Sequence, residues 1–232
     1  MVQMKISLYV QILPQREILF LEEWVNHNLN LGIDKIYIYN NGSKKIYGKS
    51  YSEFKFTYEE SISKLSDIEH KYSEVKVHSW IPKIDQEFCV ESNDPHHCNQ
   101  VFGFKHCAEN NHSDYYLHCD PDEYFVLPIH KTFKNLISDE EYREVGAFWF
   151  GPEFYEPRVN NKSINELKSS GVYKRPVGSW KHTKCMSKSL VKTPIKWAYK
   201  YDSIIHKNRS FNGISKHINK DIGYFKHYTT TR

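Results

Sequence analysis

Apolar and polar residues alternate between strand-sized and helix-sized segments along the first 130 residues. Residues 6–13 (ISLYVQIL) are rich in β-branched and aromatic side chains, which predicts a buried strand that stops at Pro14. In residues 17–31 the apolar side chains recur every three or four positions, which predicts a helix with one apolar face. Gly32 follows where a helix C-cap is expected, and residues 35–39 (KIYIY) predict a second strand. Strand, helix and strand in this order predict a parallel pair with a right-handed crossover.

The rest of the chain gives a less regular pattern. Asn40-Asn41-Gly42-Ser43 is a strong turn signal, and residues 44–72 are polar and irregular, with a helix expected near residues 59–65. Residues 98–110 predict a further helix. From Gly151 onward the pattern is typical of a loop-rich region. The remaining strands are expected at residues 74–80, 115–118, 124–127 and 145–150, and near Ser189, Ser203 and Tyr224.

This alternation predicts an α/β fold with a mostly parallel central sheet flanked by helices. No repeat, low-complexity tract or linker interrupts the chain, and 232 residues suit one compact domain. We therefore expect a single domain over residues 1–232. Within it, the last 80 residues are expected to form a more irregular half that covers the ligand-binding edge of the sheet.

Composition narrows the class of partner. The formal net charge of +4 is small, and no concentrated basic stripe indicates nucleic-acid binding. Lys and Arg gather between Lys174 and Lys226, which suits anionic small molecules such as nucleotide diphosphates and equally suits a solvated basic face. The aromatic residues suit sugar binding or an ordinary core.

The cysteines and the hydropathy of the chain indicate in which cellular compartment the protein is expected. The five cysteines contain no CxxC pair, and we interpret them as reduced thiols of a soluble, cytoplasmic protein. The longest apolar runs are strand-sized, so no transmembrane segment is expected. Docking on a membrane surface through the basic face stays open.

A cluster of carboxylates follows one predicted strand. Asp120-Pro121-Asp122-Glu123 comes directly after residues 115–118, and ligands of open α/β sheets bind beyond the carboxyl ends of strands. Two carboxylates one residue apart can share a cation, and hard oxygen ligands favour Mg²⁺ or Mn²⁺. The alternative is an acidic turn between two strands, because Asp and Pro are common turn residues.

Other short motifs accompany this cluster along nearly the whole chain. In order they are Arg16-Glu17, Glu23-Trp24, His27, Gly32, Asn40-Asn41-Gly42-Ser43, Trp80, Gln100, Cys107, Asp120-Pro121-Asp122-Glu123-Tyr124, Phe150-Gly151, Lys188-Ser189, Pro194, His206 and His227-Tyr228. The series resembles glycosyltransferase family 92 and the family 2-like enzymes grouped with it. Two residues depart from that pattern. Arg16 stands where the family has Asn, and Asn40 stands where it has an acidic residue that typically contacts the nucleoside, which leaves the donor base open.

The resemblance implies a GT-A (nucleotide-diphospho-sugar transferase, Rossmann-like) fold and a metal-dependent, inverting glycosyltransferase. Its donor would be a nucleotide-diphosphate sugar, with a UDP-sugar favoured, and its acceptor a glycan or other hydroxyl. Residues 1–130 would then bind the donor and residues 131–232 the acceptor. Asp122 is the first expected metal ligand, and Asp120 binds the metal through water or contacts the ribose. His227 is expected as a further ligand, with His206 as the alternative.

Inverting transfer also needs a general base. Glu153 and Glu156 follow a predicted strand and are the candidates, the alternative being that both are surface carboxylates of a loop. Gln15, Glu17, Asn40 and Gln100 are expected to line the nucleoside pocket. Diphosphate charge is expected to be neutralised by Lys188, or by Lys184 or Arg209.

Two other functions stay open. One is a non-catalytic carbohydrate-binding protein on a transferase fold, which the substitution at Asn40 favours. The other is a metal-dependent nucleotidyltransferase, which also uses paired carboxylates on an α/β sheet. The lack of a Gly-rich phosphate loop near the N-terminus argues against the nucleotidyltransferase.

Overall fold

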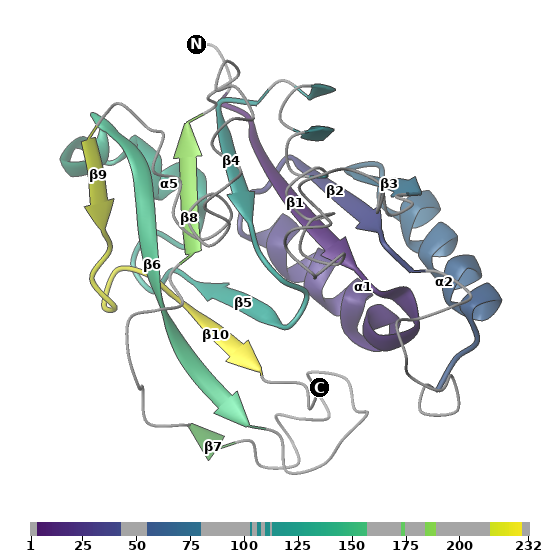
Figure 1. The fold of residues 1–232 in the computed structure, drawn as a ribbon. Coiled ribbons are helices and arrows are strands. Elements are labelled where there is room, and N and C mark those ends of the chain that lie inside the picture. The colour runs from purple at the N-terminus through teal and green to yellow at the C-terminus, as the bar shows by residue number, and fades with distance from the viewer. Residues whose placement is uncertain are drawn as a thin grey trace, which may run out of the picture.

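The computed structural model describes residues 4–42, 55–79, 103, 106–107, 110–111, 113–156, 173–174, 184–188 and 214–228. Figure 1 shows their arrangement. The helical elements are α1 (Pro14–Asn30), α2 (Tyr58–Lys71), α5 (Phe133–Ser138) and the 3-10 helix η2 (Glu140–Tyr142). The strands are β1 (Ile6–Ile12), β2 (Lys35–Asn40), β3 (Val75–Ser79), β4 (Tyr115–His118), β5 (Glu123–Val126), β6 (Val145–Glu156), β7 (Tyr173–Lys174), β8 (Lys184–Lys188), β9 (Ile214–His217) and β10 (Tyr224–Tyr228).

These strands form one sheet that draws on both the N-terminal and the C-terminal halves of the chain. Its order is β3-β2-β1-β4-β8-β6-β10-β5, with β7 and β9 also paired to β6. Strands β3, β2, β1 and β4 are mutually parallel. Beyond them β8 is antiparallel to both neighbours, and β10 is parallel to β6 but antiparallel to β5. The expected α/β fold, with a mostly parallel central sheet flanked by helices, is confirmed.

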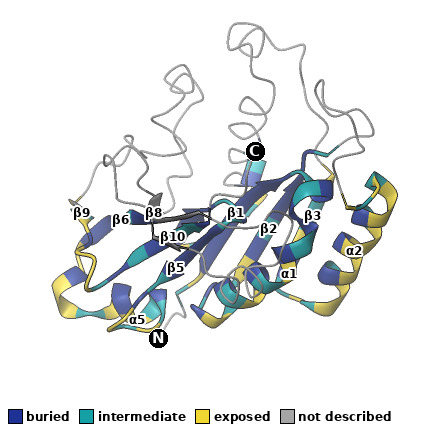
Figure 2. Ribbon diagram, turned by 90° about the horizontal axis from the view of Figure 1, so that it is seen from below, coloured by how far each residue is buried: buried dark blue, intermediate teal, exposed yellow. Residues whose placement is uncertain are grey.

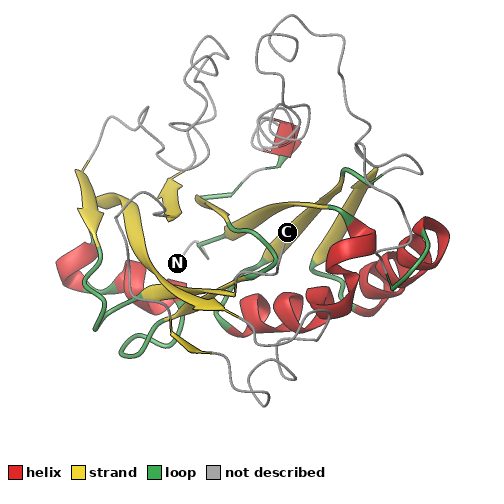
Figure 3. Ribbon diagram, turned by 60° about the horizontal axis from the view of Figure 1, so that its bottom comes forward, coloured by secondary structure: helices red, strands yellow, loops and turns green. Residues whose placement is uncertain are grey.

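The two faces of the parallel strands carry different side chains. Figures 2 and 3 show that α1, α2 and α5 lie along one side of the sheet. Successive residues of a strand point to opposite faces, so the aliphatic residues of β1 face these helices and its polar and aromatic residues face away from them. The aliphatic set, which belongs to the main core, is Ile6, Leu8, Val10 and Ile12. The other set, also buried, is Ser7, Tyr9 and Gln11.

Helix α1 begins at Pro14, three residues before the expected start. Proline occupies the first turn, where its missing N–H costs no helical hydrogen bond and its fixed φ suits the helix. Treating Pro14 only as the residue that stops β1 was therefore wrong. At the other end Gly32 has φ of 85°, the left-handed conformation that terminates helices, and the expected cap is confirmed.

Helix α2 is longer than the segment 59–65 in which a helix was expected. It begins with a capping box, because Thr57 Oγ1 accepts the Glu60 N–H at 3.2 Å while the Glu60 carboxylate accepts the Thr57 N–H at 2.8 Å. Ser61, Leu65 and Ile68 are buried and recur every three or four residues. The description of residues 44–72 as irregular is therefore wrong for the α2 segment.

Strand positions were predicted more accurately before Gly151 than after it. β4 has the expected bounds, and β8 and β10 lie where strands were expected near Ser189 and Tyr224. The loop-rich prediction after Gly151 is wrong for residues 151–156, because β6 continues to Glu156 through its pairing with β10. In the expected helix 98–110, the described residues Gly103, His106, Cys107 and Asn110 are helical. The strand expected near Ser203 lies outside the described residues.

Two further findings concern the described part of the chain. None of its helices is both long enough and apolar enough to cross a bilayer. Cys107 and Cys119 are buried thiols, and burial raises the pKa of Cys107 to about 12, so this thiol stays protonated and unreactive.

Candidate functional site

The acidic turn Asp120–Glu123 lies at the carboxyl edge of the parallel strands. β1, β2 and β4 run in the same direction. β1 and β2 end together at this edge, since Ile12 pairs with Asn40, and β4 ends slightly before them, where His118 pairs with Tyr9. The turn leaves β4 there and enters β5. This is the edge at which open α/β sheets bind their ligands.

The turn is closed by hydrogen bonds at both ends. Glu123 N–H donates to the carbonyl oxygen of Asp120 at 3.0 Å, and Asp120 N–H donates to Glu123 Oε2 at 2.8 Å. Strand β10 holds the middle, because Tyr228 N–H donates to the carbonyl oxygen of Asp122 at 2.9 Å. The backbone of Asp122 is thus held in place at this edge of the sheet.

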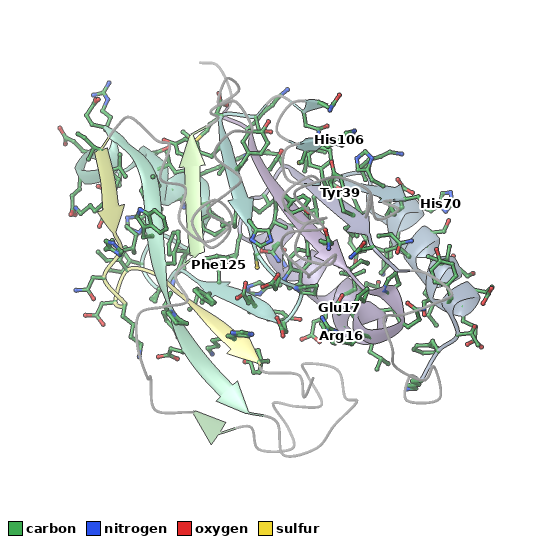
Figure 4. The ribbon with its side chains drawn as sticks, in the orientation of Figure 1. Arg16, Glu17, Tyr39, His70, His106 and Phe125 are labelled. Carbon is green, nitrogen blue, oxygen red and sulfur yellow. The ribbon has the colours of Figure 1, made fainter. Side chains whose placement is uncertain are left out.

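Helix α1 holds the strand that follows the turn. Trp24 Nε1–H donates to the carbonyl oxygen of Glu123 at 3.0 Å, and His27 Nε2–H donates to that of Phe125 at 2.9 Å. Side chains three residues apart share one face of a helix, and carbonyls two residues apart point the same way along a strand. Two motif residues that the sequence singled out, Trp24 and His27, therefore anchor β5 (Phe125 is labelled in Figure 4).

His227 lies between two carboxylates of the turn. It is paired across the β10–β5 ladder with Glu123. Its Nε2 is 3.6 Å from Asp122 Oδ2, and its Nδ1 is 4.0 Å from Glu123 Oε1. Burial lowers the pKa of His227, but the contact with Asp122 and the charges of Glu123, Asp122 and Asp120 outweigh burial and raise it overall. The carboxylates thus favour the charged form of this ring.

Asp122 and His227 are suited to hold a divalent cation whose remaining ligands would include diphosphate oxygens. Within the described residues, no three His, Cys, Asp or Glu side chains are grouped so as to hold a metal by themselves. Mg²⁺-type ions are usually bound by one or two carboxylates together with substrate phosphates. Adjacent ligands of such an ion lie about 3 Å apart, so the 3.6 Å between Asp122 and His227 needs only a small side-chain adjustment.

Arg16 and Glu17 form an ion pair at the start of α1, beside the ends of the strands (Figure 4). Glu17 is buried, and its Oε2 accepts the Leu13 N–H at 2.6 Å. Burial raises the pKa of Glu17 even though Arg16 acts to lower it. The Arg16 pKa is raised first by Glu17, and also by the charges of Asp122 and Asp120. Arg16, which sequence reasoning noted only as a departure from the family, thus brings a positive charge to the acidic turn.

Asn40 and Gln15 meet at the turn that follows β2. Both side chains are buried, and Asn40 Oδ1 accepts the Gly42 N–H at 2.9 Å. A Cβ at Gly42 would lie 2.6 Å from Pro14 Cδ and 3.2 Å from Gln15 Oε1, so glycine is required here. The oxygen of Asn40 is therefore engaged within the turn, while Glu17 is engaged at the start of α1. The nucleoside contacts expected of these residues stay predictions.

An aromatic cluster on the sheet face away from the helices was missed by sequence reasoning. The ring of Tyr9 lies 4.9 Å from that of Tyr39 and 5.4 Å from that of His118, centre to centre. Tyr39 Oη is 2.8 Å from His106 Nδ1 (both labelled in Figure 4), and burial raises the Tyr39 pKa, so its phenol is neutral. A Cβ at Gly103 would meet Tyr9 Oη at 2.5 Å. The signal in the sequence was the alternation of Tyr37 and Tyr39 in β2.

Glu153 is not brought to the acidic turn. It is buried in β6 and forms an ion pair with Lys220. Its cross-strand partner is Lys226, whereas the next residue, His227, is the partner of Glu123. Adjacent strand residues point to opposite faces, so Glu153 and His227 lie on opposite faces of the sheet. Sequence reasoning could not know this register, because it placed Glu153 in a loop.

The other predicted residues are placed only in part. Lys188 pairs with Tyr115 at the amino end of β4, the opposite end from Asp120, so the register does not favour a phosphate contact. Lys184, the alternative, begins β8 and lies at the carboxyl edge by the same register. Glu156 ends β6, opposite Tyr173. Gln100, His206 and Arg209 lie outside the described residues.

Comparisons with known proteins find solved structures that are distantly similar to this chain. No model of a protein family and no curated protein matches the sequence, so membership of glycosyltransferase family 92 stays an expectation. A protein from Bacillus anthracis assigned as a glucose-1-phosphate thymidylyltransferase, solved in complex with sucrose, superposes with a TM-score of 0.46 at 12% identity. That superposition covers 97% of this chain and 89% of the other. TarS from S. aureus superposes with a TM-score of 0.38 at 11% identity over 69% of this chain and 23% of TarS. These values are low, so the function is argued from the chain's own residues.

Proposed function

We propose that this protein is a metal-dependent glycosyltransferase that moves a sugar from a nucleotide-diphosphate donor, with a UDP-sugar favoured, to an acceptor hydroxyl with inversion. The observation that carries the proposal is the approach of Asp122 and His227 to 3.6 Å at the carboxyl edge of the parallel strands. A carboxylate in a turn held by α1 and β10, beside an imidazole from β10, suits a cation–diphosphate complex.

Asp122 and His227 would hold Mn²⁺ or Mg²⁺, with Asp120 at the other end of the turn contacting the ion through water or the donor ribose. When bound, the ion supplies charge that stabilises a departing diphosphate. Arg16 lies close enough to influence both aspartates electrostatically, and it adds positive charge for the donor phosphates. Gln15 and Asn40, at the turn after β2, would contact the nucleoside of the donor.

In the transfer itself, the acceptor oxygen attacks the anomeric carbon and forms the new glycosidic bond. The bond from that carbon to the diphosphate oxygen breaks, and the nucleoside diphosphate leaves with the bonding electrons. A general base takes the acceptor proton. Glu153 and Glu156 stay the predicted bases, and the ion pair of Glu153 with Lys220 on the other sheet face argues for Glu156 between the two.

The test is titration calorimetry of UDP into the full chain with and without Mn²⁺, followed by release of UDP from UDP-sugars with acceptor sugars. We expect Mn²⁺ to strengthen UDP binding and Asp122→Asn to abolish that gain. Asp221→Asn is the control, since Asp221 is an exposed aspartate just before β10. The absence of metal-dependent binding for every nucleoside diphosphate would overturn the proposal.

A second assay separates the competing chemistry. A nucleotidyltransferase forms nucleotide-sugar and pyrophosphate from a nucleoside triphosphate and a sugar 1-phosphate, whereas a glycosyltransferase consumes nucleotide-sugar. Pyrophosphate release under those conditions, without sugar transfer, would contradict the proposed reaction. Metal-dependent UDP-sugar binding with no transfer to any acceptor would favour the carbohydrate-binding alternative.

A further inference from the structure

Glu123 is the most enclosed carboxylate of the acidic turn. Its side chain is 2% exposed, against 18% for Asp122 and 30% for Asp120. An enclosed carboxylate is costly unless its oxygens are paired and hydrogen-bonded. The partners of Glu123 therefore indicate what this charge does.

Each oxygen of the Glu123 carboxylate faces a different part of the site. Oε2 accepts the Asp120 N–H at 2.8 Å, and Oε1 lies 4.0 Å from His227 Nδ1. The backbone carbonyl of Glu123 accepts from Trp24 Nε1 at 3.0 Å and from Cys119 Sγ at 3.3 Å. One residue thus ties the acidic turn, strand β10 and helix α1 together.

We propose that Glu123 is a positioning residue, which sets the imidazole orientation of His227 and the conformation of the acidic turn so that Asp122 and His227 face one cation. The proposal rests on the proposed function for the identity of that cation. A negative oxygen beside Nδ1 favours the tautomer with the proton on Nδ1. The lone pair of the neutral ring is then on Nε2, the atom that faces Asp122.

Replacing Glu123 by Gln separates this role from simple packing. The amide has the same shape, but it has one oxygen, which cannot both accept from Asp120 N–H and face His227 Nδ1. When the oxygen stays on Asp120, the amide N–H₂ faces His227 and favours the opposite tautomer. A packing role predicts no change of tautomer and no specific loss of metal affinity.

The matched control lies at the other end of the sheet. Asp34 Oδ2 accepts the N–H of Ile6 at 2.9 Å, and Asp34 is also paired with Lys134. Asp34 therefore joins a strand-end amide to a basic side chain, as Glu123 does, but at the amino end of β1. Asp34→Asn removes an equivalent charge without touching the acidic turn.

The experiment measures Mn²⁺ affinity of the full chain by electron paramagnetic resonance, with and without UDP and without turnover. We expect Glu123→Gln to weaken Mn²⁺ binding about 10–100-fold, as is usual for a residue that orients a metal ligand, and Asp34→Asn to leave it unchanged. Equal Mn²⁺ affinity for wild type and Glu123→Gln would overturn the positioning role. So would an equal loss in Asp34→Asn.

Nitrogen-15 NMR of the histidine rings tests the positioning role of Glu123 in the absence of metal. His227 is assigned by the signal that His227→Asn removes, and spectra are recorded at alkaline pH, where the ring is neutral. We expect Nδ1–H in the wild type and a shift toward Nε2–H in Glu123→Gln. An Nε2–H ring in the wild type would overturn the positioning role even if Glu123→Gln failed to fold. Failure of wild-type Mn²⁺ binding with UDP, combined with the expected tautomer, would instead overturn the proposed function alone.

Discussion

The two faces of the parallel strands differ in chemistry although both are buried. Toward α1 and α2, β1 presents Leu8 and its aliphatic neighbours, which belong to the main core. Away from those helices it presents Tyr9 and Gln11, which lead toward His118 and the acidic turn. Close packing of aliphatic side chains gives stability with little chemistry, whereas buried polar groups need partners at fixed positions. Burial alone therefore does not distinguish core from site in this protein.

The largest expected effect is a loss of stability on the face of β1 that packs against the helices. Leu8→Ala should lower the free energy of unfolding by about 2–5 kcal/mol, because Leu8 is fully buried and the helices cannot collapse into the space. Urea denaturation measures it, and UDP titration of the folded variant should give wild-type affinity. Ser7→Ala on the other face is the control, with an expected loss of about 0.5–1.5 kcal/mol. Reduced UDP affinity in Leu8→Ala would contradict the separation of a stabilising face from a face that carries the site.

Arg16→Gln tests the charge balance beside the site. Glu17 would keep its bond from Leu13 N–H but lose its cationic partner, a loss of about 1.5–3 kcal/mol. The pKa of Glu17 is already raised by burial, and removal of Arg16 should raise it further. An acid with a raised folded-state pKa stabilises the fold at low pH and loses that contribution as pH rises. Urea denaturation should therefore show a deficit that grows from acid to neutral pH, and an equal deficit at both would contradict the assignment.

Trp24→Phe tests whether the helix side supports the site. The carbonyl of Glu123 would keep Cys119 Sγ but lose the indole donor, which should cost about 1–3 kcal/mol. Because that carbonyl belongs to the acidic turn, metal-dependent UDP binding should weaken as well. Phe20→Leu on the same helix is the control, since Phe20 is buried in the core. It should lower the melting temperature while leaving UDP affinity unchanged, and equal affinity losses in both variants would contradict a specific link.

The smallest expected effect lies farthest from the site. Thr57→Ala removes the capping side chain of α2 and should cost about 1 kcal/mol. Thermal unfolding followed by circular dichroism measures it, with Ser63→Ala at an exposed position of the same helix as the control. UDP binding should be unaffected by either change. A measurable loss of affinity in Thr57→Ala would show that α2 contributes to the site.

Much of the parallel half could be predicted from the sequence because its signals are local. β4 matched its expected bounds, and Gly32 marked the end of α1 by its conformational freedom. β6 was cut short at Gly151 because glycine and proline usually interrupt strands, whereas pairing with β10 carries this strand through Pro152. That pairing joins residues far apart in sequence, which no local pattern reports.

The residues of the candidate site could likewise be predicted from the sequence where their signals are local. Asp120 and Asp122 were selected because a carboxylate cluster after a strand is a local signal, and His227 was linked to them by motif order. The folded chain places His227 Nε2 3.6 Å from Asp122 Oδ2. Glu153 stays a predicted base, but its position on the sheet face opposite to that of His227 could not be foreseen, because the face to which a strand residue points depends on its register. The positioning role proposed for Glu123 depends on contacts with α1 and β10, which only the folded chain reveals.

The position of β5 has a consequence for self-association. It is the last strand in the order of the sheet, and border strands ordinarily offer their backbone to a second molecule, which promotes aggregation. Here Trp24 and His27 occupy two of its carbonyls from the side. The helix that steadies the acidic turn therefore also shields this border. Conditions that detach α1 should expose both at once, so inactivation and intermolecular strand pairing are expected to set in together.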